Sequence, residues 1–163
     1  MVYKMEIYTD GGCRGNGKPW AYGAAAAVVK NKWGRHTRRR TVELPEGQDP
    51  RPSNQRAEIM GIILGLQLAL EKRQEVHPRT KFSVRIYSDS RYAIGCMTEW
   101  IYKWVQNDWT NAAGREVVNR DLIEEASDLD DDLNAVGRVR FIYIPREDNE
   151  VADELCNDCM DDM

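Results

Sequence analysis

Apolar and polar residues alternate along the first ten residues with the period of a β-strand. Met5, Ile7 and Thr9 fall on one side of the predicted strand from Tyr3 to Asp10, and Lys4, Glu6 and Tyr8 fall on the other. A strand of this kind has one buried and one more polar face, so we expect it to lie on a hydrophobic core.

Two further strands are predicted after a glycine-rich turn at residues 11–17. They cover Trp20–Val29 and roughly Trp33–Val42, and the short segment Lys30–Lys32 joins them. The chain is therefore expected to begin as an antiparallel meander.

The pattern then changes to the period of a helix. Ser53 and Asn54 can cap a long helix that runs to about Arg73, with apolar residues along one side. Later elements are predicted as a strand at Phe82–Tyr87, a helix opened by Ser88–Ser90, a helix at about Glu116–Leu129, a strand at Val139–Ile144 and a helix from about Asn149. Three strands followed by alternating helices and strands predict an α/β fold, a mixed sheet with helices on its faces.

Length and composition narrow the class of protein. A chain of 163 residues and 18.8 kDa suits a single domain, expected over residues 1–163. No apolar run approaches the roughly 18 residues that would span a bilayer. The first residues lead directly into a strand pattern instead of a signal peptide, so an intracellular protein is expected, cytoplasmic or, in a eukaryote, nuclear.

The four cysteines fit reduced thiols in such a compartment. Cys156 and Cys159 form a C-x-x-C pair, but no second pair or nearby histidine completes a zinc site. Packing is therefore the favoured role for both residues, ahead of structural zinc.

Charge is unevenly distributed. The net charge is −4, so bulk attraction does not argue for a nucleic-acid partner. Six cations nevertheless gather in one early stretch: Lys30, Lys32, Arg35, Arg38, Arg39 and Arg40. A solvated edge strand is the favoured interpretation of this stretch, and direct contact with a substrate is the alternative. The acidic segment Asp128–Asp132 is expected on the surface.

Four acidic residues occupy positions that a structural role alone explains poorly. Asp10 ends the first strand and Asp89 follows a later one, while Glu58 lies on the apolar side of the long helix and Asp153 starts the last helix. Each also has an ordinary explanation: a turn for Asp10, the helix dipole for Glu58, a cap for Asp89 and a solvated face for Asp153.

Taken together, these acids point to a metal site. In an open sheet, sites form beyond the carboxyl ends of adjacent strands, and two helices can bring Glu58 and Asp153 above Asp10 and Asp89. Four carboxylates repel one another unless cations neutralise them, and two Mg²⁺ ions would balance their charge. Hard oxygen ligands favour Mg²⁺ or Mn²⁺ over Zn²⁺.

The residues around these acids resemble the four active-site blocks of type 1 ribonuclease H. The blocks are Tyr8–Cys13, Ser53–Glu58, Tyr87–Ser90 and Asn149–Asp153, and Trp100–Asn119 is similar to the handle segment of that family. The resemblance runs from about Tyr3 to Cys159.

The resemblance implies a five-stranded mixed sheet and an endonuclease that cuts the RNA strand of RNA/DNA hybrids. It implies that Asp10, Glu58, Asp89 and Asp153 bind two Mg²⁺ and that the products carry 5′-phosphate and 3′-hydroxyl ends. The expected partner is an RNA/DNA hybrid, and the expected state is a monomer.

Substrate contacts follow from the same resemblance. The 2′-hydroxyl of RNA is expected to be read by the turn Gly11, Gly12 and Cys13 with Asn16 and Gln55, and the minor groove is expected to meet Asn54 and Gln55. A phosphate pocket is implied at Arg51, Ser53 and Asn119. Among the tryptophans of the handle, Trp104 is our candidate for a wall beside the DNA sugars, with packing as the alternative.

Two features depart from the family pattern. The loop before the last helix, Pro145–Asp148, lacks the histidine that many members carry. The two histidines of the chain, His36 and His77, fall in segments that are expected to lie away from this loop. Arg146 and Glu147 are candidate substitutes. The handle is also less basic than in many relatives, which predicts weaker hybrid binding.

Two other functions stay open on the sequence alone. A protein with this fold could have lost catalysis and act as a nucleic-acid-binding scaffold. The chain could also be the ribonuclease H domain of a retroelement polyprotein.

Overall fold

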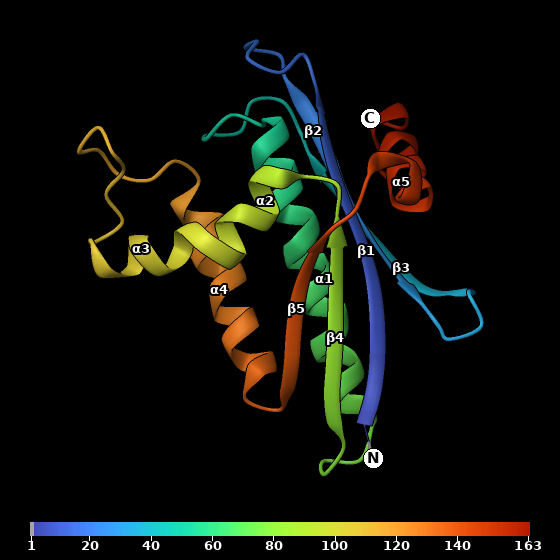
Figure 1. Cartoon of the computed structure of the whole chain (residues 1–163). Coiled ribbons are helices and arrows are strands. Elements are labelled where there is room, and N and C mark those ends of the chain that lie inside the picture. The colour runs from blue at the N-terminus through green and yellow to red at the C-terminus, as the bar shows by residue number, and fades with distance from the viewer. Residues whose placement is uncertain (1) are drawn as a thin grey trace.

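The computed structural model describes residues 2–163, which form a five-stranded sheet flanked by helices (Figure 1). The strands are β1 (Val2–Arg14), β2 (Tyr22–Lys30), β3 (His36–Leu44), β4 (Lys81–Ser88) and β5 (Gly137–Tyr143). Their order in the sheet is β3-β2-β1-β4-β5. β1 to β3 pair antiparallel, whereas β1, β4 and β5 pair parallel, so the predicted mixed sheet is confirmed.

Helices connect and cover the sheet. They are α1 (Asn54–Glu75), α2 (Arg91–Gly95), the π-helical turn η1 (Cys96–Trp100), α3 (Ile101–Gln106), α4 (Arg120–Asn134), the 3-10 turn η2 (Arg146–Asp148) and α5 (Glu150–Asp161). α1 and α4 pack on one face of the sheet, and α5 packs on the other across β1, β2 and β3.

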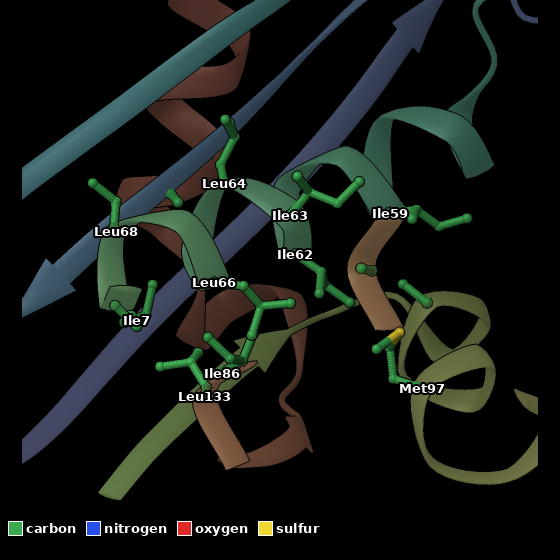
Figure 2. Close-up of a cluster of buried hydrophobic side chains, with 14 of the residues drawn as sticks. Ile7, Ile59, Ile62, Ile63, Leu64, Leu66, Leu68, Ile86, Met97 and Leu133 are labelled. Carbon is green, nitrogen blue, oxygen red and sulfur yellow. The ribbon is translucent and has the colours of Figure 1, made fainter. Parts of the chain in front are cut away.

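The main core lies between α1, the sheet and α4. Figure 2 shows apolar side chains of α1 gathered with Ile7 of β1, Ile86 of β4 and Leu133 of α4, all of them fully buried. A smaller cluster under α5 includes Cys156 and Met160, so the last helix is ordered by burial of its apolar side. Cys156 Sγ also donates to the Ala24 carbonyl oxygen at 3.2 Å.

The predicted glycine turn is partly wrong, because β1 continues through it to Arg14. Gly11 pairs with Ala25 and Gly12 with Ala24 of β2. The glycine at position 11 is required by α1: a Cβ there would lie 2.1 Å from the Ala57 carbonyl oxygen. The glycines thus let a helix approach a strand closely, which brings the start of α1 next to Asp10.

Two other element boundaries differ from prediction. β3 begins at His36 instead of Trp33, because Asn31 Oδ1 accepts from the backbone N–H groups of Trp33 and Arg35 and forms a tight turn. α4 starts at Arg120, since Asn119 has a left-handed backbone (φ 65°) that ends the preceding loop, and it continues to Asn134.

Within residues 2–163, no helix combines the length and the apolar character needed to cross a membrane. Part of the basic stretch, Arg38–Arg40, lies on β3, which is the outermost strand at one side of the sheet. This agrees with the favoured interpretation of an edge strand. Two of its cations are neutralised by α1: Arg38 pairs with Glu75 and Arg40 with Glu71.

Candidate active site

Asp10 lies where the sheet opens. The parallel pairing of β1 with β4 ends at Thr9 and Ser88, whereas Asp10 still pairs with Ala26 of β2. Thr9 Oγ1 donates to the Tyr87 carbonyl oxygen at 2.9 Å and fixes this end of the two strands. Asp10 is therefore held on rigid backbone at the carboxyl end of β4, with only 7% of its surface exposed.

Glu58 reaches the same place from α1. Ser53 caps that helix, its Oγ accepting from the Arg56 N–H at 3.1 Å, and Glu58 lies in the next turn facing the sheet, half-buried. Ser90 Oγ donates to Glu58 Oε2 at 2.5 Å. Burial raises the pKa of Glu58 and the charge of Asp89 raises it further, while Ser90 and Arg146 act in the opposite direction.

Asp89 is not the cap of α2. Ser90 has that role, since its Oγ accepts from the Ala93 N–H at 3.0 Å. The carboxylate of Asp89 instead meets the side chain of Asn149, whose Nδ2 lies 3.4 Å from Asp89 Oδ2 and 2.9 Å from the Thr9 carbonyl oxygen. The capping explanation for Asp89 is therefore wrong.

Asp153 comes from the first turn of α5, with its N–H donating to the Asn149 carbonyl oxygen at 3.1 Å. Burial, the charge of Asp89, and hydrogen bonding and repulsion from Asp153 raise the pKa of Asp10 to about 8. The raised pKa of Asp10 reflects its burial first and the negative charge of two neighbouring carboxylates second. In Figure 1 the ends of β4 and the first turns of α1, α2 and α5 surround this end of the sheet.

The fit of these residues to a metal can be judged from their chemistry and their placement. All four donors are carboxylate oxygens, the ligands that Mg²⁺ and Mn²⁺ prefer, and their mutual repulsion favours a cation. In the part of the chain that the structure describes, however, no three acidic, histidine or cysteine side chains converge as metal ligands do. Glu58 instead bonds to Ser90 and Asp89 to Asn149, so the donor chemistry fits a divalent ion while the side chains hold protein partners.

The predicted substrate contacts gather at the start of α1. Asn54 Oδ1 accepts from the Cys13 N–H at 2.9 Å, and the Asn54 N–H donates to Asn16 Oδ1 at 3.1 Å. Gly11, Gly12 and Cys13 pair with β2, so they do not form the free turn that the sequence predicted. Gln55 is exposed beside this group.

Of the three residues predicted as a phosphate pocket, Ser53 and Asn119 share a partner, Arg56, whereas Arg51 has a different one. Ser53 is engaged as the cap of α1, and Arg51 Nη1 donates to the Gly17 carbonyl oxygen at 3.0 Å. Asn119 is fixed from two sides: Arg56 Nη1 donates to its Oδ1 at 3.3 Å, and its Nδ2 donates to the Tyr92 hydroxyl at 3.1 Å.

Trp104 of α3 is half-buried between two other tryptophans. Its ring centroid lies 6.1 Å from that of Trp100 and 6.1 Å from that of Trp109. Trp100 is more open, with 40% of its surface exposed. Packing thus explains part of the tryptophan pattern.

Several residues that organise this site were not assigned a role from the sequence pattern. Arg56 clamps Asp121 with two hydrogen bonds of 3.0 and 2.8 Å and holds Asn119, while Ser90, Tyr92 and Asn149 position the acids and the pocket. Their partners are 27 to 140 residues away along the chain, beyond the reach of local patterns. Arg56, Ser90 and Asn149 could have been found from their places inside the motif blocks Ser53–Glu58, Tyr87–Ser90 and Asn149–Asp153, whereas Tyr92 lies outside them.

The two histidines lie in different parts of the fold. His77 is in the connection between α1 and β4, where its Nδ1 accepts from the Arg79 N–H. His36, expected elsewhere, lines a hollow of about 200 Å³ together with Glu147 and Asp148 of η2. No histidine lies in η2 itself.

Comparison with known proteins identifies the family. The model of the family described as RNase H matches residues 3–160. The ribonuclease H of Chlorobium phaeovibrioides is 32% identical over 159 residues, covering 97% of this chain and 93% of that protein. The ribonuclease H of Thermosynechococcus vestitus is 29% identical over 157 residues, covering 96% and 86%.

Solved structures agree in fold. The N-terminal RNase H domain of a Mycobacterium tuberculosis protein superposes with a TM-score of 0.69 at 24% identity, covering 97% of this chain and 94% of that one. LC11-RNase H1, solved in complex with an RNA/DNA hybrid, gives a TM-score of 0.66 at 21% identity and 94% coverage of both chains. The match to the family model includes all four acids, and the chain belongs to the RNase H family.

Proposed function

We propose that this protein is an endonuclease that hydrolyses the RNA strand of RNA/DNA hybrids and leaves 5′-phosphate and 3′-hydroxyl ends. The observation that carries the proposal is the proximity of four acids, from β1, α1, the β4–α2 connection and α5, at one end of the sheet in a chain of the RNase H family. A structural relative solved with an RNA/DNA hybrid supports the choice of substrate. Residues 1–163 are proposed to act as one catalytic domain and as a monomer.

We propose Asp10, Glu58, Asp89 and Asp153 as the residues that would hold two Mg²⁺, or Mn²⁺, ions. Such ions, when bound, supply Lewis-acid polarisation of the phosphate and activation of a water. The chain contributes positioning: Asp10 is fixed by strand backbone, and Glu58 by α1 and Ser90. Preorganised charge of this kind lowers a barrier without covalent catalysis.

Substrate selection is proposed to depend on the start of α1. Asn54 already uses its Oδ1 on Cys13, which leaves its amide N–H₂ group to donate to a nucleotide, next to Asn16 and Gln55. Arg51, Ser53 and Asn119 are proposed to bind a phosphate of the DNA strand. The clamp of Arg56 on Asn119 supports this role because it fixes the side chain before substrate arrives.

Arg146 is our candidate for the function that a loop histidine has in many family members. It is exposed in η2, and its charge lowers the pKa of Glu58, so it lies on the side of the acids. Arg146→Ala is expected to reduce kcat several-fold with little change in KM, measured by steady-state cleavage. Asp148→Asn is the matched control in the same turn, and an unchanged kcat in Arg146→Ala would exclude Arg146.

The proposal is tested with labelled RNA/DNA hybrid, double-stranded RNA and double-stranded DNA, each with Mg²⁺ or with chelator. Only the hybrid with Mg²⁺ should be cut. Asp10→Asn should abolish turnover and retain hybrid binding, because it removes a ligand charge and keeps the fold. A wild-type protein that binds hybrid but never cuts it would instead be a scaffold, and cleavage that survives chelator would exclude the metal role.

A further inference from the structure

The β2–β3 hairpin carries a group of cations that the proposed active site does not use. In residues 2–163, Lys30, Lys32, Arg35 and Arg39 have no carboxylate within 4.0 Å, whereas Arg38 and Arg40 on the same strand are paired with α1. Lys32, Arg35 and Arg39 are exposed. A protein of net charge −4 thus keeps an unneutralised positive surface on this hairpin, which includes one edge strand of its sheet.

The tip of this hairpin presents an aromatic ring to solvent. Trp33 is 75% exposed, more than any other large apolar side chain among the described residues. Lys32 Nζ lies 4.6 Å from the centroid of that ring, so charge and aromatic surface are adjacent. Exposing an indole to this degree costs solvation free energy, which a partner that covers the ring would recover.

The tip is held in one conformation. Asn31 Oδ1 accepts from the N–H groups of Trp33 and Arg35 at 3.0 and 2.9 Å, and the Asn31 N–H donates to the Arg35 carbonyl oxygen at 2.8 Å. Gly34 takes the left-handed conformation that this turn requires (φ 80°). A fixed turn loses little conformational entropy on binding, so it suits a contact surface.

The base of the hairpin lies beside the segment that leads into α5. Lys30 and His36 line one side of the hollow of about 200 Å³, and residues 147–152, which lead into the helix that carries Asp153, line the other. In Figure 1 the loop between β2 and β3 projects from the sheet on the side of α5. A strand that leaves the acids along the start of α5 would therefore meet Lys30 first and the tip of the hairpin, residues 31–35, beyond it.

We propose that the β2–β3 hairpin is a second nucleic-acid contact, which binds a single-stranded extension of the hybrid. Lys30, Lys32 and Arg35 would bind its phosphates, and a base would stack on Trp33. The inference rests on the proposed function. A protruding ring fits an unpaired base better than a duplex, because bases within a duplex already stack on one another.

The test compares affinity for blunt RNA/DNA hybrid with affinity for the same hybrid carrying a single-stranded tail, on either strand and at either end. Affinities are measured by fluorescence anisotropy with chelator present. Wild type should bind at least one tailed hybrid more tightly than the blunt one. Trp33→Ala should weaken binding of that tailed hybrid about fivefold or more, in line with the loss of base stacking.

Matched variants separate stacking from charge. Trp33→Phe should keep most of the tail affinity because it keeps a ring, whereas Trp33→Leu should lose it. Lys32→Glu should lower the salt dependence of tailed-hybrid binding by about one phosphate contact. Arg138→Glu, the same charge reversal on exposed β5 surface, should change tailed and blunt binding equally.

Blunt-hybrid cleavage keeps the two proposals distinguishable. It should be unchanged in Trp33→Ala, and its absence in wild type would overturn the proposed function, not the hairpin contact. Equal affinity of wild type for every tailed and blunt hybrid would overturn the hairpin proposal. The hairpin proposal would also be overturned if a glutamate-rich peptide bound in a Trp33-dependent way while no tail added affinity. The surface would then be a protein-docking site.

Discussion

The hydroxyl group of Ser90 links two parts of the site. Ser90 Oγ accepts from the Ala93 N–H as the cap of α2 and donates to Glu58 Oε2 from α1. A single side chain thus fixes the start of one helix and the direction of an acid on another. Because its hydrogen bond lowers the pKa of Glu58, it also favours the charged carboxylate that a cation needs.

Ser90→Ala is expected to affect both stability and metal use. Loss of the cap should lower the free energy of unfolding by about 1 kcal/mol. Loss of the bond to Glu58 should raise the Mg²⁺ concentration that gives half-maximal cleavage, so activity falls most at low Mg²⁺. A Mg²⁺ titration of cleavage and a urea denaturation curve measure the two effects.

Ser90→Thr is the control, because it keeps the hydroxyl and should retain the wild-type Mg²⁺ dependence. If Ser90→Ala is less stable yet titrates with Mg²⁺ as the wild type does, Ser90 serves only as a cap. The positioning role would then be withdrawn.

Helix α4 shows how burial overrides the local preference of acidic residues against the last turn of a helix. Acids are unfavourable in the last turn of a helix, yet α4 runs through Asp130, Asp131 and Asp132 to Asn134. Leu133 is fully buried in the main core and extends the helix past these acids. Burial and the charge of Asp131 raise the pKa of Asp130 to about 6, so this helix carries a charge at neutral pH that the fold disfavours.

Asp130→Asn should therefore stabilise the protein at pH 7. A carboxyl group whose pKa is higher in the folded state than in the unfolded chain lowers stability as pH rises between the two values, here from about 4 to about 6. The gain should be about 1–2 kcal/mol at pH 7, since one pKa unit is worth about 1.4 kcal/mol and the group is partly exposed. It should vanish near pH 4. Urea denaturation at both pH values measures it.

Asp128→Asn is the matched control for this prediction, because it removes the same charge from an exposed position of the same helix. A similar gain in both variants would show that net charge, not burial of Asp130, is responsible. A gain for Asp130→Asn that persists at pH 4 would also contradict the assignment.

Elements were predictable from the sequence to the extent that their patterns were local. The alternation of Met5, Ile7 and Thr9 predicted β1, and Ser53 marked the start of α1. The end of β1 was not predictable, because Gly11 has its place through Ala57 of a helix more than forty residues later. The same holds for the site: its acids could be named from their positions, but Arg56, Ser90 and Asn149 act through distant partners.

The distribution of charge over the protein limits how tightly it can bind a hybrid. The net charge is −4, and the handle segment keeps Lys103 and Arg115 but also places Asp108 among them. Arg120, at the start of α4, is already bound to Glu116 and Glu124, so it offers little free charge to a phosphate. The handle therefore provides few cations for the backbone of a hybrid.

Binding of blunt hybrid should accordingly depend weakly on salt. Each phosphate contact contributes about 0.9 to the slope of log K against log salt concentration, so a small number of contacts gives a shallow slope. Fluorescence anisotropy from 50 to 300 mM salt measures it, with a basic-handled ribonuclease H as reference. Asp108→Lys should tighten binding and steepen the slope by about one contact, because it adds a cation where the handle now carries an acid. If wild type already matches the reference in slope and affinity, cations outside the handle must bind the hybrid. Arg51 and Arg146 would then be the first residues to replace with glutamine.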